Sequence, residues 1–272
     1  MGSAISTALR WLRKHAIIII GLLIIAYIML PNIVVIIFSF NQPVGRRNGI
    51  WHEFSFNAWT HICAPAGMCD AVGLSLGIGV VAALVATVIG TMAAFALVRY
   101  RFRGRGTTNL LVFFPMATPE VVMGSSLLTL FIAVGVRSGI ATILIAHILF
   151  TLSFVVTTVK ARVASMDPAL EQAAADLYAT PSQAFWRVTF PLAAPGIAAG
   201  ALLAFALSFD DYIVTSFNAG PSTITFPMYI WGAAQKGVPV QVNVIGTIMF
   251  LGAIAIVAIA QGIGSRKSKV EA

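Results

Sequence analysis

Three acidic residues lie within long apolar stretches of the sequence, where carboxylates are unusual. They are Glu120, Asp210 and Asp211. A charge at the centre of a bilayer costs about 2.5–3.5 kcal/mol on insertion scales, so such a residue usually faces a cavity or a partner. No Lys or Arg lies inside these stretches, and His147 is the only basic candidate for pairing. Unpaired carboxylates along a path would favour a cationic ligand, although each could instead bond two helices together or cap a helix end.

The surroundings of these acids suggest where they lie. Pro115 and Pro119 each remove a backbone donor just before Glu120, so we expect a broken helix with a carboxylate at the break. At the rise of a helix, Glu120 is about 12 residues, or ~18 Å, into its stretch, near mid-membrane. Asp210 and Asp211 are expected near the outer end of theirs. Neighbours on a helix diverge by about 100°, so only one of the two should face a lumen.

Aromatic residues near the two aspartates complete the predicted path. Tyr212, Phe209, Trp231 and Tyr229 could add cation–π contacts at its outer mouth. The residues that we predict to line the path are Glu120, Asp210, Asp211, Tyr212 and Trp231.

The composition shows which elements must hold these residues. The 272-residue chain is 59% hydrophobic and 10% charged, with a mean hydropathy of +0.93. These values exclude a water-soluble enzyme, a disordered chain and a small disulfide scaffold. Without the alternation of barrel strands, the apolar stretches predict an all-α integral membrane protein with one domain over residues 1–272. Six membrane-spanning helices are expected at about 16–38, 72–98, 108–134, 138–159, 192–214 and 242–263. The first is too long for a cleaved signal peptide and ends in Phe38-Ser39-Phe40, so we interpret it as a retained span.

Basic residues divide unevenly between the two sides of this arrangement. The net charge is +8, and with both termini in the cytoplasm 13 of the 17 Lys and Arg residues lie on the cytoplasmic side. These are Arg10, Arg13, Lys14, Arg99, Arg101, Arg103, Arg105, Lys160, Arg162, Arg187, Arg266, Lys267 and Lys269, against Arg46, Arg47, Arg137 and Lys236 on the outer side. The split follows the positive-inside rule and predicts that both termini are cytoplasmic. Because no contiguous basic patch is interleaved with aromatics, no nucleic-acid partner is expected.

An outer loop at 39–71 holds the only two cysteines, Cys63 and Cys69. Two thiols separated by five residues on an oxidising face could form a small disulfide loop, with a turn at Pro65 and Gly67. Two free thiols remain the alternative. A metal site would need more ligands than His61 and Asp70 nearby, and none is expected. The tryptophans of the loop, Trp51 and Trp59, suit a membrane interface.

A second polar stretch, 160–190, is predicted to contain two short helices joined by a tight turn. Asp167 before Pro168 is typical of a helix start, and Thr180-Pro181-Ser182-Gln183 has the pattern of a capping box. Pro191 should then separate the second helix from the following span. The apolar positions of the first helix share one face: Ala169, Leu170, Ala173, Ala174 and Leu177. Such a ridge would either enter a partner's groove or lie on lipid.

This stretch resembles the cytoplasmic loop of permeases from binding-protein-dependent ABC importers. That loop reads Glu-Ala-Ala, three residues, Gly, nine residues, Ile-x-Leu-Pro; Gln172-Ala173-Ala174 matches its start, and 188–191 match its end. Two departures stand out: Gln172 replaces the glutamate, with Glu171 just before it, and Tyr178 replaces the glycine. A bulky Tyr does not easily take the left-handed conformation that glycine allows, so either the bend differs or the ATPase groove accepts a ring. The segments 119–124, 204–221, 226–230 and 237–243 are similar to the second permease of spermidine/putrescine importers.

The resemblance implies a type I importer fold in the bacterial cytoplasmic membrane, with an ATPase dimer, a second homologous permease and an extracytoplasmic polyamine-binding protein as partners. The residues that it assigns to ATPase coupling are Glu171, Gln172, Ala173, Ala174, Asp176, Leu177, Tyr178 and Pro181. No glycine precedes Lys-Ser or Lys-Thr, so the chain has no P-loop. We therefore expect it to bind no cofactor, and a partner ATPase to use ATP and magnesium.

Other functions are weaker alternatives. The same class of permease could carry ferric iron, a phosphonate or an opine, but anionic cargo would need basic groups that this chain does not offer in its spans. A stand-alone secondary transporter or channel would not need a Gln-Ala-Ala loop. An intramembrane enzyme would need a nucleophile–base or multi-histidine set within the spans, and the sequence has none there.

Overall fold

The computed structural model describes the backbone of residues 2–45 and 47–270, and the side chains of residues 15–45, 47–256 and 258. The chain divides into two compact units, Met1–Ala66 with Gly232–Ala272, and Gly67–Trp231. We describe each unit by itself. Helices dominate both units, and the all-α prediction is confirmed. Seven of the basic residues used for the topology have no described side chain: Arg10, Arg13, Lys14, Arg46, Arg266, Lys267 and Lys269.

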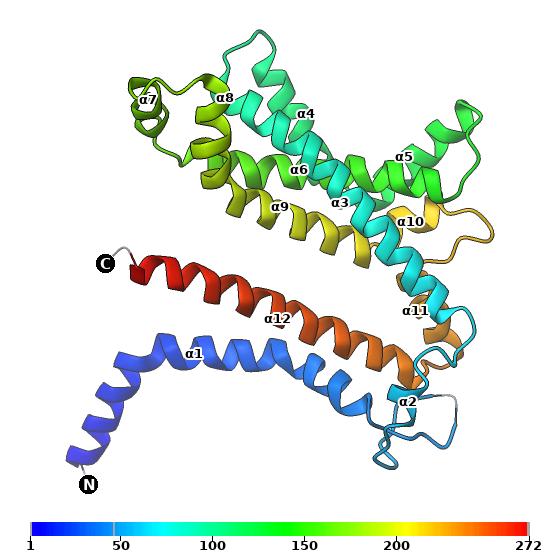
Figure 1. Ribbon diagram of the computed structural model, residues 1–272. Helices are drawn as coiled ribbons and strands as arrows, with labels where there is room; N and C mark the ends of the chain where they lie inside the picture. Colours follow the sequence, from blue (N-terminus) through cyan, green and yellow to red (C-terminus); the bar gives the residue numbers. More distant parts are fainter. Residues whose placement is uncertain (1, 46, 271–272) are drawn as a thin grey trace. The chain divides into compact units, whose positions relative to one another are not determined.

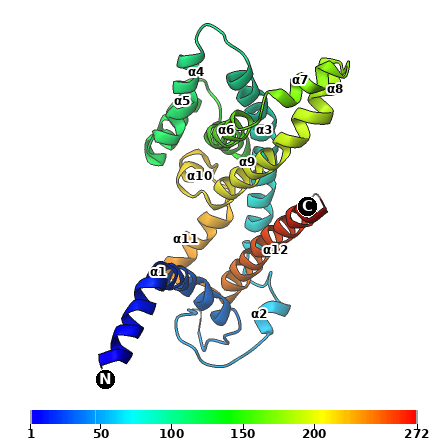
Figure 2. The same ribbon diagram turned by 90° about the vertical axis from the view of Figure 1, so that its left-hand side faces the viewer.

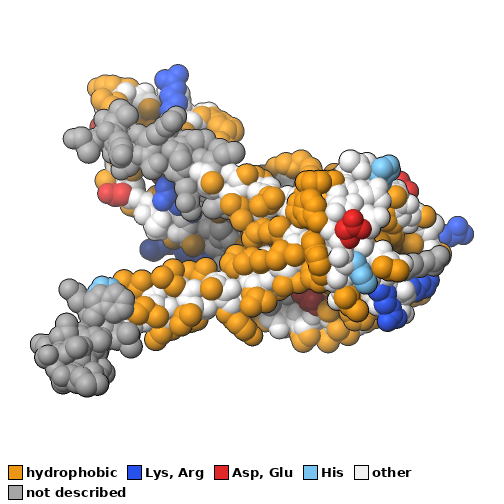
Figure 3. All heavy atoms as spheres, turned by 90° about the horizontal axis from the view of Figure 1, so that it is seen from below, with side chains coloured by type: hydrophobic (Ala, Val, Ile, Leu, Met, Phe, Trp, Pro, Cys, Tyr) orange, Lys and Arg blue, Asp and Glu red, His pale blue; other side chains and the backbone are white. Residues whose placement is uncertain are grey.

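The first unit pairs the two terminal helices, α1 (Gly2–Phe38) and α12 (Val240–Val270). The described side chains of α1, from His15 to Phe38, are mostly exposed aliphatics, and hydrophobic groups run along this part of the helix in Figure 3. The short helix α2 (Asn57–Thr60) packs against α12, where Ala58 and Val244 are buried together. In the loop, Phe40 stacks on Phe54 and Trp59, with ring centroids 5.6 and 5.2 Å apart. This unit therefore presents a long apolar helix that ends in an aromatic cluster.

Three long helices form the core of the second unit. They are α3 (Met68–Arg99), α6 (Ile140–Ala164) and α9 (Phe190–Asp210), which lie side by side in Figures 1 and 2. Small residues of α3 and α9 pack on a row of valines on α6, including Val155 and Val159. Because alanines and glycines let backbones approach closely, the helices pack tightly without a large hydrophobic side chain at each contact.

Glycines mark the closest of these contacts. A Cβ placed on Gly196 of α9 would lie 2.5 Å from Cβ of Arg162, and one on Gly90 of α3 would lie 2.7 Å from Cγ1 of Val155. Arg162 also donates from Nε to the carbonyl of Leu192, at 2.8 Å. By contrast, a Cβ placed on Gly73 or Gly77 of α3 would have no heavy atom of another described helix within 4 Å. Glycines recur four residues apart at Gly73 and Gly77 and at Gly196 and Gly200, a spacing typical of close helix packing, and the structure has a close contact at Gly196 but none at Gly73 or Gly77 among the residues that it describes.

The third predicted span is broken. Helix α4 (Arg105–Ala117) and helix α5 (Glu120–Ala133) meet at Thr118–Pro119 with a bend of 108°. Pro115 lies inside α4, whereas Pro119 stands at the break itself, directly before α5. Glu120 is the first residue of α5, at the break where the sequence analysis placed it.

The fifth predicted span differs at both ends. A π-helical turn, η1 (Phe185–Thr189), joins the short helix α8 (Pro181–Ala184) to α9, so the helical run begins at Pro181 and Pro191 does not separate them. Pro191 has no backbone N–H to donate, and the wider π-helical turn just before it accommodates such a residue. The expectation that the span continues to 214 is wrong, because the helix ends at Asp210. The chain restarts in α10 (Ile213–Asn218), and α11 (Phe226–Lys236) follows.

Four described helical segments are long and apolar enough to cross a membrane: His15–Phe38, Met68–Arg99, Ile140–Ala164 and Pro181–Asp210. The bent α4–α5 pair makes a fifth if it forms one span, and Val240–Ile256 is a shorter apolar segment of α12. The end of the predicted sixth span, 259–263, lies outside the residues with described side chains.

Candidate functional site

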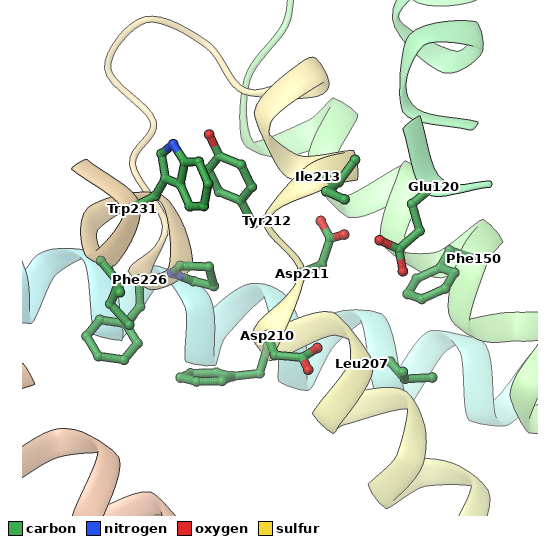
Figure 4. Close-up of a pocket in the computed structure, with 12 residues that line it drawn as sticks. Glu120, Phe150, Leu207, Asp210, Asp211, Tyr212, Ile213, Phe226 and Trp231 are labelled. Carbon is green, nitrogen blue, oxygen red and sulfur yellow. The ribbon is translucent and has the colours of Figure 1, made fainter. Parts of the chain in front are cut away.

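An acidic pocket lies in the second unit where α9 ends. Its volume is about 550 Å³, and its walls come from α5, α6, α9, α10 and the start of α11. Figure 4 shows the lining residues, which are Glu120, Phe150, Leu207, Phe209, Asp210, Asp211, Tyr212, Ile213, Phe226, Pro227, Ile230 and Trp231. All five residues predicted to line a path are therefore in one pocket. A count along one straight helix predicts a different depth for Glu120 from that of the two aspartates, and the break in the third span removes the basis of that count.

Two of the three carboxylates in the acidic pocket are accessible. Glu120 and Asp210 are exposed, and neither accepts a hydrogen bond from a side chain or forms an ion pair among the described residues. In Figure 4 the carboxylates of Glu120 and Asp211 point into the same space. Negative charges that share a hollow of this size repel one another, so a cation that enters it would be stabilised.

The third carboxylate, Asp211, is buried and fully occupied by donors. It sits in extended backbone between α9 and α10, and accepts hydrogen bonds from the backbone N–H groups of Val214 (3.2 Å) and Thr215 (2.7 Å). The hydroxyl of Thr215 donates to Oδ2 at 2.7 Å, and Nε2 of His147 lies 3.3 Å from the same oxygen. Asp211 thus holds the start of α10, which is the helix-capping alternative given above. The expectation that only one of the two aspartates faces a lumen assumed that both lie on one helix. It does not apply, because Asp211 is outside the helix that holds Asp210.

Aromatic rings form the other wall of the acidic pocket. Tyr212 stacks on Trp231 with ring centroids 5.1 Å apart and an angle of 28° between the planes. Phe209 and Phe226 add further ring faces, with centroids 6.1 Å apart. Tyr229, the fourth aromatic residue considered from sequence, is not among the lining residues. The pocket thus combines carboxylates with faces that attract cations.

Sequence reasoning missed two lining aromatics, Phe150 and Phe226, and one partner of Asp211, Thr215. It did name His147 as the only basic candidate for pairing with the acids, and His147 lies 3.3 Å from Asp211. Phe150 lies in an apolar helix where any side chain is a candidate for packing. A sequence signal exists for Phe226, because it precedes Pro227 at a helix start after a loop of small and polar residues. Contacts of His147 with residues more than 60 positions away have no local signal.

The second predicted site is an elbow between α6 and α9, which we define as residues 165–189. It contains α7 (Ala169–Asp176), α8 and η1. Oδ1 of Asp167 accepts from the N–H of Ala169 at 2.9 Å. The capping box at Thr180 is confirmed, with Gln183 bonded to Thr180 in both directions at 2.9 and 3.3 Å. The two short helices and their caps therefore follow the sequence pattern.

The turn after α7 is a Schellman motif built on a tyrosine. Ala179 N–H donates to the carbonyl of Ala174 and Tyr178 N–H to that of Ala175, at 3.0 and 2.9 Å. Tyr178 has φ of 60°, the left-handed conformation that glycine usually supplies at this position. The first of the two alternatives for this bend, a different local shape, is therefore wrong. The ring of Tyr178 is 96% exposed.

Glu171 connects the elbow to the bundle. Its Oε1 lies 2.8 Å from Nη2 of Arg99, at the end of α3, and accepts from the hydroxyl of Thr189 in η1 at 2.8 Å. Gln172, the residue at the motif's glutamate position, is exposed. Glu171, the acid next to the motif's glutamate position, is therefore already paired with Arg99 and Thr189 of the same chain.

The predicted ridge on α7 is largely open. Leu170 and Leu177 are 46% and 81% exposed, and Ala173 is exposed as well, whereas Ala174 is buried. The elbow extends beyond the bundle in Figure 1, where α7 and α8 lie past the ends of α6 and α9. An apolar surface of this kind is typical of a docking site.

A family described as "Binding-protein-dependent transport system inner membrane component" matches residues 86–269. The chain belongs to this family. The matched region contains α5 with Glu120, the α9–α10 break and the whole elbow. The resemblance noted from the loop and the segments beyond it is confirmed.

Two curated permeases of Escherichia coli (strain K12) are similar over nearly their whole length. The spermidine/putrescine transport system permease protein PotC is 38% identical over 247 residues, covering 90% of this chain and 92% of PotC. The putrescine transport system permease protein PotI is 36% identical over 247 residues, covering 88% of this chain and 87% of PotI. This member of the family is thus related to permeases named for polyamine transport.

Solved structures of ABC importers share the fold. A chain from the crystal structure of a bacterial ABC transporter that imports the acidic polysaccharide alginate superposes with a TM-score of 0.65 at 18% identity, over 94% of this chain and 97% of that chain. A chain from the alginate transporter bound to its periplasmic protein and an alginate pentasaccharide gives a TM-score of 0.68 at 16% identity, over 94% and 96%. The fold is therefore that of an ABC importer permease.

Proposed function

We propose that this permease is the membrane subunit of an ATP-driven importer whose cargo is a polyamine such as putrescine or spermidine. The observation that carries the proposal is the acidic pocket, in which Glu120 and Asp210 are exposed and without an ion-pair partner among the described residues. The similarity of the whole chain to PotC and PotI supports the same cargo.

The chemistry of a polyamine suits both walls of the acidic pocket. Its ammonium groups would pair with Glu120 and Asp210, and its methylene segments would lie against Tyr212 and Trp231. A cation over an aromatic face gains about 0.5–1 kcal/mol at exposed sites and about 2 kcal/mol when desolvated. An anionic cargo would instead meet the free carboxylates of Glu120 and Asp210, and so phosphonates are disfavoured.

The partners follow from the architecture that we propose. An ATPase dimer would bind ATP and magnesium and grip the elbow, with the exposed residues Gln172, Leu177 and Tyr178 at the contact. A second homologous permease would complete the path, and an extracytoplasmic binding protein would deliver the polyamine. The single permease domain would lie in the bacterial cytoplasmic membrane with six spans and both termini in the cytoplasm.

Reconstitution tests this function. We expect proteoliposomes that contain both permeases, the ATPase and the binding protein to accumulate radiolabelled putrescine or spermidine only when ATP is enclosed. Omission of this chain should abolish uptake. ATP-driven uptake of ferric iron or a phosphonate in place of polyamines, or polyamine uptake by this chain alone, would overturn the proposal.

The pairing of Cys63 with Cys69 in a disulfide is part of the same proposal, because it places their loop on the oxidising side. Alkylation with iodoacetamide before and after reduction tests it. We expect the mass to increase only after reduction, by two alkyl groups, and labelling without reduction would contradict the pairing.

A further inference from the structure

A buried polar network surrounds His147, which has no role in the function proposed so far. Its ring is almost fully buried on α6, with Nδ1 2.7 Å from Oγ of Ser208 on α9 and Nε2 2.9 Å from Oγ1 of Thr215 on α10. Asp211 Oδ2 lies 3.3 Å from the same Nε2. One imidazole thus contacts the last turn of α9, the break and α10.

Hydrogen counting sets the direction of these bonds. The Thr215 hydroxyl has one hydrogen, and its shortest acceptor is Asp211 Oδ2 at 2.7 Å. Its oxygen must then accept from Nε2–H of His147, and with a neutral imidazole the Ser208 hydroxyl donates to Nδ1. Every donor in the network has an acceptor, and Asp211 receives only donors, as an ionised carboxylate requires.

We infer that His147 is a positioning residue that holds Asp211 in place, and that Asp211 shapes the cargo site without being a ligand of the cargo. The residues on either side of Asp211, Asp210 and Tyr212, both line the acidic pocket. Because Asp211 is tied to α6 and α10, the backbone between those two neighbours is held at the break. We call the contacts of His147 and Thr215 with Asp211 the clamp. This inference rests on the proposed function for the identity of the cargo, but the clamp does not depend on the cargo.

Two substitutions of His147 separate a positioning role from a general need for a polar residue. His147→Leu removes both ring nitrogens, whereas His147→Gln keeps an amide donor that can reach Thr215. In the reconstituted complex we expect His147→Leu to raise the KM for putrescine about tenfold with Vmax changed less than about threefold, and His147→Gln to restore most of the affinity. Ser153→Ala, another buried polar position on α6 that does not line the pocket, is the matched control and should leave both values unchanged.

A double substitution tests whether His147 acts through Asp211. We expect Asp211→Asn to raise KM similarly, and the pair His147→Leu with Asp211→Asn to be no worse than the poorer single variant, because both remove one clamp. Fully additive effects, or His147→Leu kinetics equal to those of the unchanged protein, would overturn the inference. If His147→Leu fails to assemble, Thr215→Val and Ser208→Ala each remove one hydroxyl and must give the same pattern.

A cargo-independent measurement distinguishes this inference from the proposed function. A cysteine introduced as Asp210→Cys reports the pocket wall through its reaction rate with a cationic methanethiosulfonate. We expect His147→Leu to change that rate about fivefold or more, and Ser153→Ala to leave it unchanged. An unchanged rate in His147→Leu would refute the clamp even if polyamines are transported. A changed rate, with no polyamine transport by the complex that keeps Asp210, would refute only the cargo.

Discussion

The acidic pocket and the elbow lie at the two ends of the same helices, α6 and α9, and they are built in opposite ways. At the pocket, Asp211 is buried and receives bonds from two other elements. At the elbow, Leu177 and Tyr178 are 81% and 96% exposed, and Glu171 supplies an ion pair back to the bundle. A site that recognises a small cargo needs its groups held in advance, whereas a surface that docks on a protein can complete its contacts on binding.

The largest effect is expected at the acidic pocket, from loss of its free charges. Glu120→Gln and Asp210→Asn should each raise the KM for polyamine about tenfold or more, equivalent to about 1.4 kcal/mol, because each removes one partner of an ammonium group. Initial uptake rates in proteoliposomes measure this. Asp70→Asn, an exposed acid that does not line the pocket, is the control. Unchanged polyamine kinetics in both variants would argue for another cargo.

At the elbow, the Arg99–Glu171 pair should carry movement between α7 and α3. Reversal of one charge in Glu171→Arg places two cations together, so we expect transport per ATP hydrolysed to fall about fivefold, about 1 kcal/mol, while KM stays unchanged. The exchange of both charges, Arg99→Glu with Glu171→Arg, should recover part of the loss. A rise in KM without loss of coupling would contradict the separation of the two ends.

The contact between α6 and α9, the two helices that run from the elbow to the pocket, should depend on Gly196. Gly196→Ala forces a methyl group against Arg162 and should destabilise the protein by about 1–3 kcal/mol, measured as a lower midpoint of thermal unfolding in detergent. Gly77→Ala is the matched control because its site is open, and it should be neutral or slightly stabilising. Equal effects of the two would show that the α6–α9 contact is looser than described.

The smallest effect on transport is expected at Tyr178, where the change is one of local stability. Because a left-handed conformation costs a residue with a side chain about 1–2 kcal/mol, Tyr178→Gly should slow hydrogen exchange in α7 severalfold. Leu177→Ala, which keeps the left-handed residue, should not slow it. Faster exchange in Tyr178→Gly would mean that ring contacts, and not the backbone, stabilise the turn.

Local patterns predicted local features. Asp167, Thr180 and Pro119 mark helix starts and a break through bonds to residues a few positions away, and all three act as expected. The apolar stretches likewise predicted an all-α chain with long spans.

What could not be predicted depends on contacts between distant residues. The sequence named His147 as a candidate for pairing but could not say which of the three acids it contacts, because Asp211 is 64 positions away. Gly73 and Gly196 share one sequence pattern, yet a close neighbour faces one of them and not the other. Tyr178 has the left-handed backbone conformation that the sequence analysis considered difficult for a tyrosine. The two hydrogen bonds of the Schellman turn favour this conformation.

The π-helical turn at Phe185–Thr189 has a mechanical consequence. Because it fuses α8 to α9, the segment Pro181–Asp210 is one rod of 30 residues, ~45 Å at the helical rise. If this rod rotated by about 10° about its Pro181 end, its Asp210 end would move by ~8 Å, several times the length of a hydrogen bond. Asp210 stands at that far end, so a rotation of the rod would change the separation between its carboxylate and Glu120 more than it would move any residue near Pro181.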